Sequence, residues 1–287
     1  MITLRIGQFS RSPVLGAARH LGWDRDLGLD LQVGPVPSSP AQFAALRERE
    51  IDVALTSPDN VLLYASTDRN PLGQQLPLRI RRAIDGGLGL ALVCRPEIET
   101  GEQLTRQPVA VDVLPSGFAM LLKALLRQHG VDEDQCEFIE AGATPKRAER
   151  LIEGSIGCTI LNAESRVRAE SAGMRSWASS EAVSPLYPGT VLATLTESPD
   201  ISALLELWDR TTQWLLDAPD DEVRAALVAH APELGSREYL DLMRSPTVGL
   251  QRNPAVSIEQ LQILADLRKS CGAWAPETAQ MRSLAMR

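Results

Sequence analysis

Short apolar runs alternate with amphipathic segments over the first part of the chain, and this alternation constrains the fold more than any other feature. Residues 4–9, 29–36 and 51–56 have the composition of strands. Residues 14–27 and 38–50 place apolar side chains at helical spacing, and Ser38 and Pro40 are typical of a helix start. Strands that alternate with helices in this way predict a parallel sheet with helical crossover connections.

The middle of the chain repeats this pattern and predicts a second α/β unit. The turn residues Asp85, Gly86 and Gly87 separate two expected strands. The strands of this part are expected at 78–84, 88–95, 109–113, 136–140 and 156–161, and the helices at 118–129, 144–153 and 163–172. A last strand at 190–195 is followed, from Ser198, by helical patterns alone.

The order of these elements places two changes of lobe near residues 95–99 and 187–190. Lobe 1 is then 1–94 plus 190–287, with the C-terminal helices, and lobe 2 is 95–189. Two such crossings form a hinge, and the cleft between hinged lobes is the expected place for a ligand.

The composition excludes several classes of protein. The formal net charge is −8, from 29 Lys and Arg against 37 Asp and Glu, so nucleic-acid binding is not expected. No apolar run approaches the roughly 20 residues of a membrane span, so membrane insertion is not expected. The four cysteines lack CxxC spacing, so a zinc or iron–sulfur site is not expected. No other metal and no cofactor is expected either. We expect free thiols, and a pairing of Cys136 with Cys158 stays open.

The N-terminus bears on the expected location. Residues 1–7 enter a strand at once, with no charged and then apolar leader and no small-residue cleavage site. The chain as written is therefore expected in the cytoplasm. A removed leader would instead place it in the periplasm or anchor it to a membrane.

Several fragments resemble a known family in their order and spacing. They are residues 4–7, 21–23, 28–30 and 50–54 in the first unit, and Asp112, 116–119, Gly142, Arg147, Gly154, 161–162 and 187–189 in the second. Over residues 4–217 the chain resembles type 2 periplasmic binding proteins, in the group of nitrate, sulfonate and taurine binders and thiamine-pyrimidine-synthase-like solute-binding proteins. The resemblance implies a two-lobed α/β fold of that type with hinge crossings and a helical C-terminal tail. It also implies an ABC transporter substrate-binding role, with a permease or another partner protein.

The first candidate site residues follow two strands of lobe 1. Ser10 and Arg11 come after the first strand, where a serine hydroxyl can bond a ligand and an arginine can hold an anion. Ser57 and Asp59 follow the third strand, and each is also typical of a helix cap without any ligand. Ligands of open α/β sheets bind at the carboxyl ends of strands, so these four residues are ligand-binding candidates.

The second lobe offers a similar set. Asp112, Ser116, Gly117 and Phe118 connect a strand to a helix, whose N-terminus favours a carboxylate, sulfonate or phosphate. Gly117 would let a ligand approach the backbone, and Phe118 either stacks on a ring or packs in the core. Asp112 leaves a cationic ligand open as the alternative to an anionic one.

The remaining candidates lie at the last lobe 2 strand and at the crossings. Asn162 is expected to touch the ligand, Glu164 is either functional or a helix-start carboxylate, and Tyr187 either closes the cleft as a ligand-binding residue or packs in the core. Asp85 is expected to form a turn, and a position facing the cleft is its alternative. The three histidines are expected to be structural or solvated: His20, His129 and His230.

These residues support two main hypotheses and a third. The first is that the cleft binds a small polar or anionic organic molecule, as a solute-binding protein does. The alternative is a cytoplasmic enzyme on the same scaffold, a decarboxylase, lyase or biosynthetic tailoring enzyme, with Asp112, Asp59 and Glu164 as catalytic candidates. The third is a sensor read by a partner protein. Motifs for a serine hydrolase, a zinc protease and a dinucleotide site are absent from the sequence.

Overall fold

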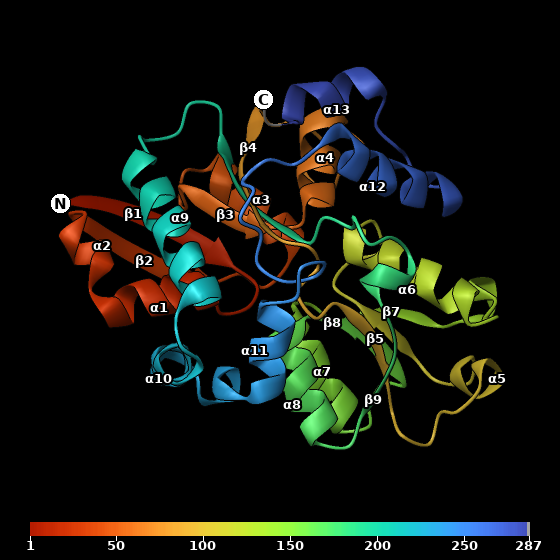
Figure 1. The fold of residues 1–287 in the computed structure, drawn as a ribbon. Coiled ribbons are helices and arrows are strands. Elements are labelled where there is room, and N and C mark those ends of the chain that lie inside the picture. Colours follow the sequence, from red (N-terminus) through yellow and green to blue (C-terminus); the bar gives the residue numbers. More distant parts are fainter. Residues whose placement is uncertain (286–287) are drawn as a thin grey trace.

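The computed structural model describes residues 1–285 and contains two separate five-stranded sheets (Figure 1). The first sheet has the order β2-β1-β3-β10-β4. Its strands are β1 (Ile2–Gln8), β2 (Leu29–Pro35), β3 (Val53–Thr56), β4 (Leu78–Asp85) and β10 (Thr190–Leu195). β1 pairs in parallel with β2 and β3, as the alternation predicts, and β10 pairs antiparallel with β3 and β4.

The helices between these strands complete lobe 1. They are α1 (Pro13–Leu21), α2 (Trp23–Asp26), α3 (Ser39–Arg47) and α4 (Pro58–Ser66). The single helix expected at 14–27 is two helices, because Gly22 adopts a left-handed conformation with φ of 75° and ends α1. Lobe 1 here means the first sheet together with α1–α4.

The second sheet has the order β7-β6-β8-β5-β9 and defines lobe 2 together with α5–α8. Its strands are β5 (Ala91–Cys94), β6 (Val109–Val111), β7 (Phe138–Glu140), β8 (Cys158–Leu161) and β9 (Arg175–Ser179). Its helices are α5 (Gly101–Leu104), α6 (Gly117–Gln128), α7 (Thr144–Ile152) and α8 (Ala163–Ser171), with short 3-10 turns at Glu133–Gln135 and Ser180–Ala182. The edge strand β9 is absent from the sequence prediction.

The first crossing between the lobes lies earlier than expected. β5 pairs with β8 and β9 of the second sheet, so the chain changes lobe at residues 86–90, not at 95–99. Residues 91–94 therefore belong with the second sheet rather than with lobe 1. The return crossing, at residues 180–189, falls between β9 and β10 and overlaps its expected position. The two crossings lie side by side, because the amide of Gly189 donates a hydrogen bond of 3.0 Å to the carbonyl of Asp85.

The C-terminal tail consists of helices, as expected, and contacts both lobes. They are α9 (Ser202–Asp217), α10 (Asp220–His230), α11 (Arg237–Met243), α12 (Ile258–Ser270) and α13 (Thr278–Leu284), with a 3-10 turn at Pro232–Gly235. α9 and α10 pack on α1, whereas α11 contacts α8 and α12 contacts both α4 and α6. The tail therefore spans the two lobes instead of covering lobe 1 alone (Figure 1).

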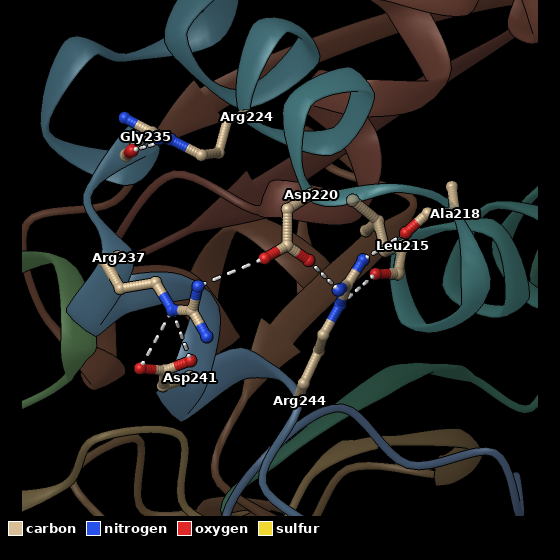
Figure 2. Close-up of polar contacts among 8 residues, drawn as sticks. All are labelled: Leu215, Ala218, Asp220, Arg224, Gly235, Arg237, Asp241 and Arg244. Carbon is tan, nitrogen blue, oxygen red and sulfur yellow. Dashed lines mark hydrogen bonds and ion pairs between the residues drawn. The ribbon is translucent and has the colours of Figure 1, made fainter.

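Charged side chains fix the connection from α9 to α11 (Figure 2). Arg244 donates hydrogen bonds to the carbonyls of Leu215 and Ala218, at 3.0 and 2.6 Å, and to Asp220 at 2.6 Å. These donors satisfy carbonyls at the end of α9 that have no partner inside the helix. The arrangement holds α11 in place, and α11 carries Tyr239 toward the cleft.

The buried apolar side chains form three clusters, of which one extends through both lobes. One buried cluster joins Leu62 of α4, Leu264 of α12 and Leu121 of α6, and so connects lobe 1, the tail and lobe 2. All four cysteines are free, so Cys136 and Cys158 do not pair. Within residues 1–285, none of the helices is long and apolar enough to cross a membrane.

Candidate functional site

A cavity of about 100 Å³ lies between the two lobes. Lobe 1 contributes the carboxyl ends of β1, β3 and β4, lobe 2 contributes the starts of α6, α7 and α8, and the tail contributes Tyr239 and Leu250. A cavity of roughly 10–15 Å³ holds one water molecule, so this volume suits a small organic molecule.

Serine caps position the helix starts around this cavity. Ser12, Ser57 and Ser116 precede α1, α4 and α6, and the hydroxyl of each accepts a hydrogen bond from a first-turn amide. The caps begin the helices where the strands end, so the helix N-termini gather at the cleft. In this way the local sequence pattern produces the site's geometry.

Contacts between the lobes close one side of the cavity. The Nδ2 of Asn162 donates a hydrogen bond of 2.8 Å to the Oγ of Ser10. The backbone amide and the Nε of Arg11 donate to the two carboxylate oxygens of Glu164, at 3.0 and 2.9 Å. Arg11 also pairs with Glu233 of the tail, at 2.6 Å. These three contacts form what we call the rim: Ser10–Asn162, Arg11–Glu164 and Arg11–Glu233.

Most of the predicted site residues line the cavity. In lobe 1 they are Ser10, Arg11 and Ser57, and in lobe 2 they are Asp112, Ser116, Phe118, Asn162 and Glu164. That any of them binds a ligand stays a prediction.

Asp59 and Gly117 are not cavity residues. The carboxylate of Asp59 forms a buried ion pair with Arg268 of α12. A Cβ added to Gly117 would lie 2.5 Å from the Cβ of Asp59, so the space that we expected for a ligand contains the Asp59 side chain. The two residues instead form a tight contact between the lobes.

Tyr187 also lies outside the cavity lining, which agrees with the packing alternative and not with a ligand-binding role. Its side chain is 1% exposed, and its hydroxyl has no hydrogen-bond partner within residues 1–285. Burial raises the pKa of this hydroxyl, and nearby Asp59 adds to the effect. The ring lies next to Gly87 and packs against the first crossing.

Asp85 forms the expected turn and also lines the cavity. One carboxylate oxygen accepts hydrogen bonds from the amides of Gly87 and Leu88, at 2.8 and 2.9 Å. Burial raises the pKa of this carboxyl, because desolvation disfavours its charge. Asp85 therefore holds the hinge segment in shape at the edge of the site.

The three catalytic candidates do not form a free acid and base pair. Asp59 is paired with Arg268, and Glu164 is paired with Arg11. Asp112 accepts hydrogen bonds from Ser116 and, at 3.4 Å, from Ser39 across the cleft. His20, His129 and His230 do not line the cavity. The arrangement can hold a small molecule, and two of the three carboxylates are paired with arginines.

Arg147 and Asn60 are site residues that the candidate set omitted. Arg147 is 1% exposed and reaches the cavity from α7, and Asn60 is 5% exposed and reaches it from α4. Burial lowers the pKa of Arg147, although Asp112 opposes this shift. Asn60 follows Ser57, the N-cap of α4, by three residues. Its place in the first turn of a helix that begins at the cleft was the signal in the sequence that could have identified it.

Comparisons with known proteins support the fold. No family model matches the chain, and no curated protein matches its sequence. The nitrate-binding protein NrtA from Synechocystis PCC 6803 is 12% identical, with 98% of this chain and 84% of that one covered and a TM-score of 0.77. The alkanesulfonate-binding protein SsuA from Xanthomonas axonopodis pv. citri, bound to MOPS, is 15% identical, with 98% and 96% covered and a TM-score of 0.74.

A third structure has the same architecture. It is a conserved Candida albicans gene product described as having the generic periplasmic binding protein fold, 13% identical, with 99% and 94% covered and a TM-score of 0.69. The chain has the two-lobed α/β fold of type 2 periplasmic binding proteins, as the sequence resemblance implied.

Proposed function

We propose that this protein binds a small organic molecule between its lobes and releases it unchanged. The observation that carries the proposal is a cavity lined by polar side chains from both lobes. Asn60 lines it from lobe 1 and Asn162 from lobe 2. A ligand that contacts both lobes stabilises the closed state over the open one.

The hinge supports a cycle of opening and closing. The first crossing contains Gly87 and Gly89, with φ of 95° and 62°, a backbone region that glycine adopts without strain. Two of the rim contacts, Ser10–Asn162 and Arg11–Glu164, join the lobes beside the cavity, so the ligand enters when they break and is enclosed when they form. The fold neighbours named as nitrate- and alkanesulfonate-binding proteins support this function.

The enzyme alternative has less support. The three carboxylates that catalysis would use are occupied by Arg268, by Arg11 and by two serines. The fold neighbours cited above for their ligands are named as binding proteins. A permease partner and a periplasmic location belong to the binding proposal. One fold neighbour is named as the ligand-binding component of an ABC-type import system, and NrtA is named as a periplasmic protein.

Calorimetry with recovery of the ligand tests the proposal. Compounds that raise the melting temperature are titrated into the protein, incubated with it, and then analysed by NMR. The proposal expects stoichiometric binding and unchanged compound. Conversion of the compound would overturn it in favour of an enzyme, and a complete lack of stabilising compounds would overturn binding itself.

A further inference from the structure

Two cysteines of lobe 2 lie directly opposite each other in the second sheet. Cys94 is the last residue of β5 and Cys158 is the first residue of β8, and the two are register partners in the antiparallel pairing of these strands. Side chains of opposed residues point to the same face of a sheet. Both side chains are fully buried in the same apolar cluster. The two thiols are therefore neighbours, although they lie far apart in the sequence.

The hydrogen-bond pattern of β5 and β8 brings these two side chains especially close. The amide of Arg95 donates a hydrogen bond of 3.0 Å to the carbonyl of Gly157, which is the next opposed pair along the two strands. Hydrogen-bonded and non-hydrogen-bonded pairs alternate in an antiparallel ladder, so Cys94 and Cys158 form a non-hydrogen-bonded pair. In such a pair the Cα atoms lie about 4.5 Å apart, within the range of about 4.4–6.8 Å that a disulfide spans. A bond between the two sulfur atoms therefore needs no rearrangement of the backbone.

The surroundings of the two thiols limit when such a bond forms. Burial raises the pKa of the Cys158 thiol, and the neighbouring Cys94 thiol adds to the rise. The thiolate is the form that attacks a disulfide, so the folded and reduced pair reacts slowly with an oxidant. In the unfolded chain both thiols are accessible, and oxidation is therefore expected to accompany folding.

Cys136 is the competing partner within lobe 2. Its side chain is half-buried and packs against the same apolar cluster. Burial raises the pKa of its thiol to about 11, and nearby Cys158 adds to the rise. However, Cys136 precedes β7, and the sheet order places β6 between β7 and β8. Cys94 is the better-placed partner, because its strand pairs with β8 directly.

From these observations we propose that Cys94 and Cys158 form a cross-strand disulfide when the chain folds in an oxidising compartment. The oxidant is itself a disulfide, either oxidised glutathione or the disulfide of a thiol–disulfide oxidoreductase. Each cysteine thiol gives up its proton, the S–S bond of the protein forms, and the S–S bond of the oxidant takes up two electrons and two protons to become two thiols. The periplasm is such a compartment, whereas the cytoplasm keeps thiols reduced.

The disulfide links the strand that leaves the hinge to a strand that leads to the rim. β5 follows the first crossing, and β8 is followed by Asn162, which bonds Ser10. The bond closes a long loop that contains α5, β6, α6, β7 and α7, so it restricts the unfolded chain and stabilises the folded protein. Neither cysteine lines the cavity, so the inference does not depend on the proposed binding function.

Refolding with and without an oxidant tests the proposal. The full chain is reduced in denaturant and refolded either in a mixture of reduced and oxidised glutathione or in reductant alone. Free thiols are then labelled with N-ethylmaleimide in denaturant, the labels are counted by mass spectrometry of the intact protein, and peptide mapping without reduction identifies any linked pair. We expect two labels after oxidative refolding, with Cys94 linked to Cys158, and labels on all four cysteines after refolding in reductant.

Variants separate this pair from the other two cysteines. Cys136→Ser with Cys271→Ser keeps only the proposed pair and is expected to take up no label after oxidative refolding. Its melting temperature is expected to be at least about 5 °C higher than that of the same variant refolded in reductant. The matched control adds Cys94→Ala to this variant. The control has no second thiol to pair with, so its melting temperature is expected to be the same after both treatments.

Two results on the unaltered chain would overturn the proposal. They are labels on all four cysteines after oxidative refolding, and a link from Cys158 to Cys136 instead of Cys94. In the variant that keeps only the proposed pair, a linked form that melts no higher than the reduced form would also overturn it, because the bond would then not fit the strands. None of these results bears on whether the cavity binds a ligand.

Discussion

Arg268 on α12 and Asp59 at the start of α4 form an ion pair that is almost completely buried, with side chains 1% and 2% exposed. The Nε of Arg268 lies 2.7 Å from one carboxylate oxygen, and an Nη2 donor contacts the other. The same Nη2 donates to the carbonyl of Pro115 at 3.1 Å, just before α6. One guanidinium therefore joins the tail, lobe 1 and lobe 2.

Removing this cation is expected to destabilise the protein strongly. Arg268→Met leaves the carboxylate of Asp59 buried and unpaired, which costs about 3–5 kcal/mol in the free energy of unfolding. Urea denaturation measures this loss. The double variant Asp59→Leu with Arg268→Met is expected to lose less than Arg268→Met alone, since no charge is left unpaired. Arg252→Met, at an exposed pair with Asp217, is the control and is expected to change little. If Arg268→Met and Arg252→Met lowered the free energy of unfolding by a similar amount, the result would contradict the assignment of Arg268 and Asp59 as a buried ion pair.

A methyl group at Gly117 is expected to separate the lobes. In Gly117→Ala the new Cβ meets the Asp59 side chain, which the ion pair with Arg268 holds in place. Overpacking of this kind costs about 1–3 kcal/mol. Small-angle scattering is expected to show a larger radius of gyration, and urea denaturation a lower stability. Gly34→Ala, where nothing lies within 4 Å of the added carbon, is the control for the substitution itself. An unchanged radius in Gly117→Ala would show that the lobes do not meet there.

The Arg11–Glu164 pair at the rim is expected to hold the lobes together without adding much stability. Arg11 is 44% exposed, so screening by water limits the coupling to below about 1 kcal/mol. A double-mutant cycle with Arg11→Gln and Glu164→Gln measures this coupling in the unfolding free energy. The same variants are expected to enlarge the radius of gyration in solution. Arg237 and Asp241 form an exposed pair within α11, and a cycle there should leave the radius unchanged.

Acid is expected to destabilise the protein partly through His230. Burial lowers the pKa of this imidazole, and the cations Arg11 and Arg19 add to the shift. The unfolded chain then binds the proton first as the pH falls below about 6.5, so stability is present above that pH and is lost below it. In His230→Gln the unfolding free energy should depend less on pH between 6.5 and 5. If the unfolding free energy changed equally with pH in His230→Gln and in the unaltered protein, His230 would not contribute to the loss of stability in acid.

The sequence predicted two α/β lobes but placed one strand in the wrong lobe. The parallel pairing of β1 with β2 and β3 follows from local periodicity, and the structure confirms it. β5 is fully buried and follows β4 after a short glycine-rich turn, so it resembles the second strand of a hairpin. Its place is decided by pairing with β8 and β9, far along the chain. The strand β9 is a half-buried edge strand with polar residues, which gives little signal.

The candidate site shows the same division between local and distant causes. Ser10, Ser57 and Ser116 were predictable because strand ends and helix caps are local patterns. Asp59 is not a cavity residue because its side chain pairs with Arg268. Arg268 is 209 residues away in the sequence and belongs to no motif, so the sequence did not indicate this pair. Arg147 entered the prediction only through a family resemblance, because a buried arginine on an amphipathic helix looks like a surface one until its acceptors are known.

A crystal structure of the protein with the tightest-binding compound from the calorimetric titrations tests the account most directly. The account predicts the compound in the cavity between the lobes, in contact with residues of both lobes and chemically unchanged. A compound bound elsewhere on the protein, or held in the cavity by one lobe alone with the lobes apart, would contradict it.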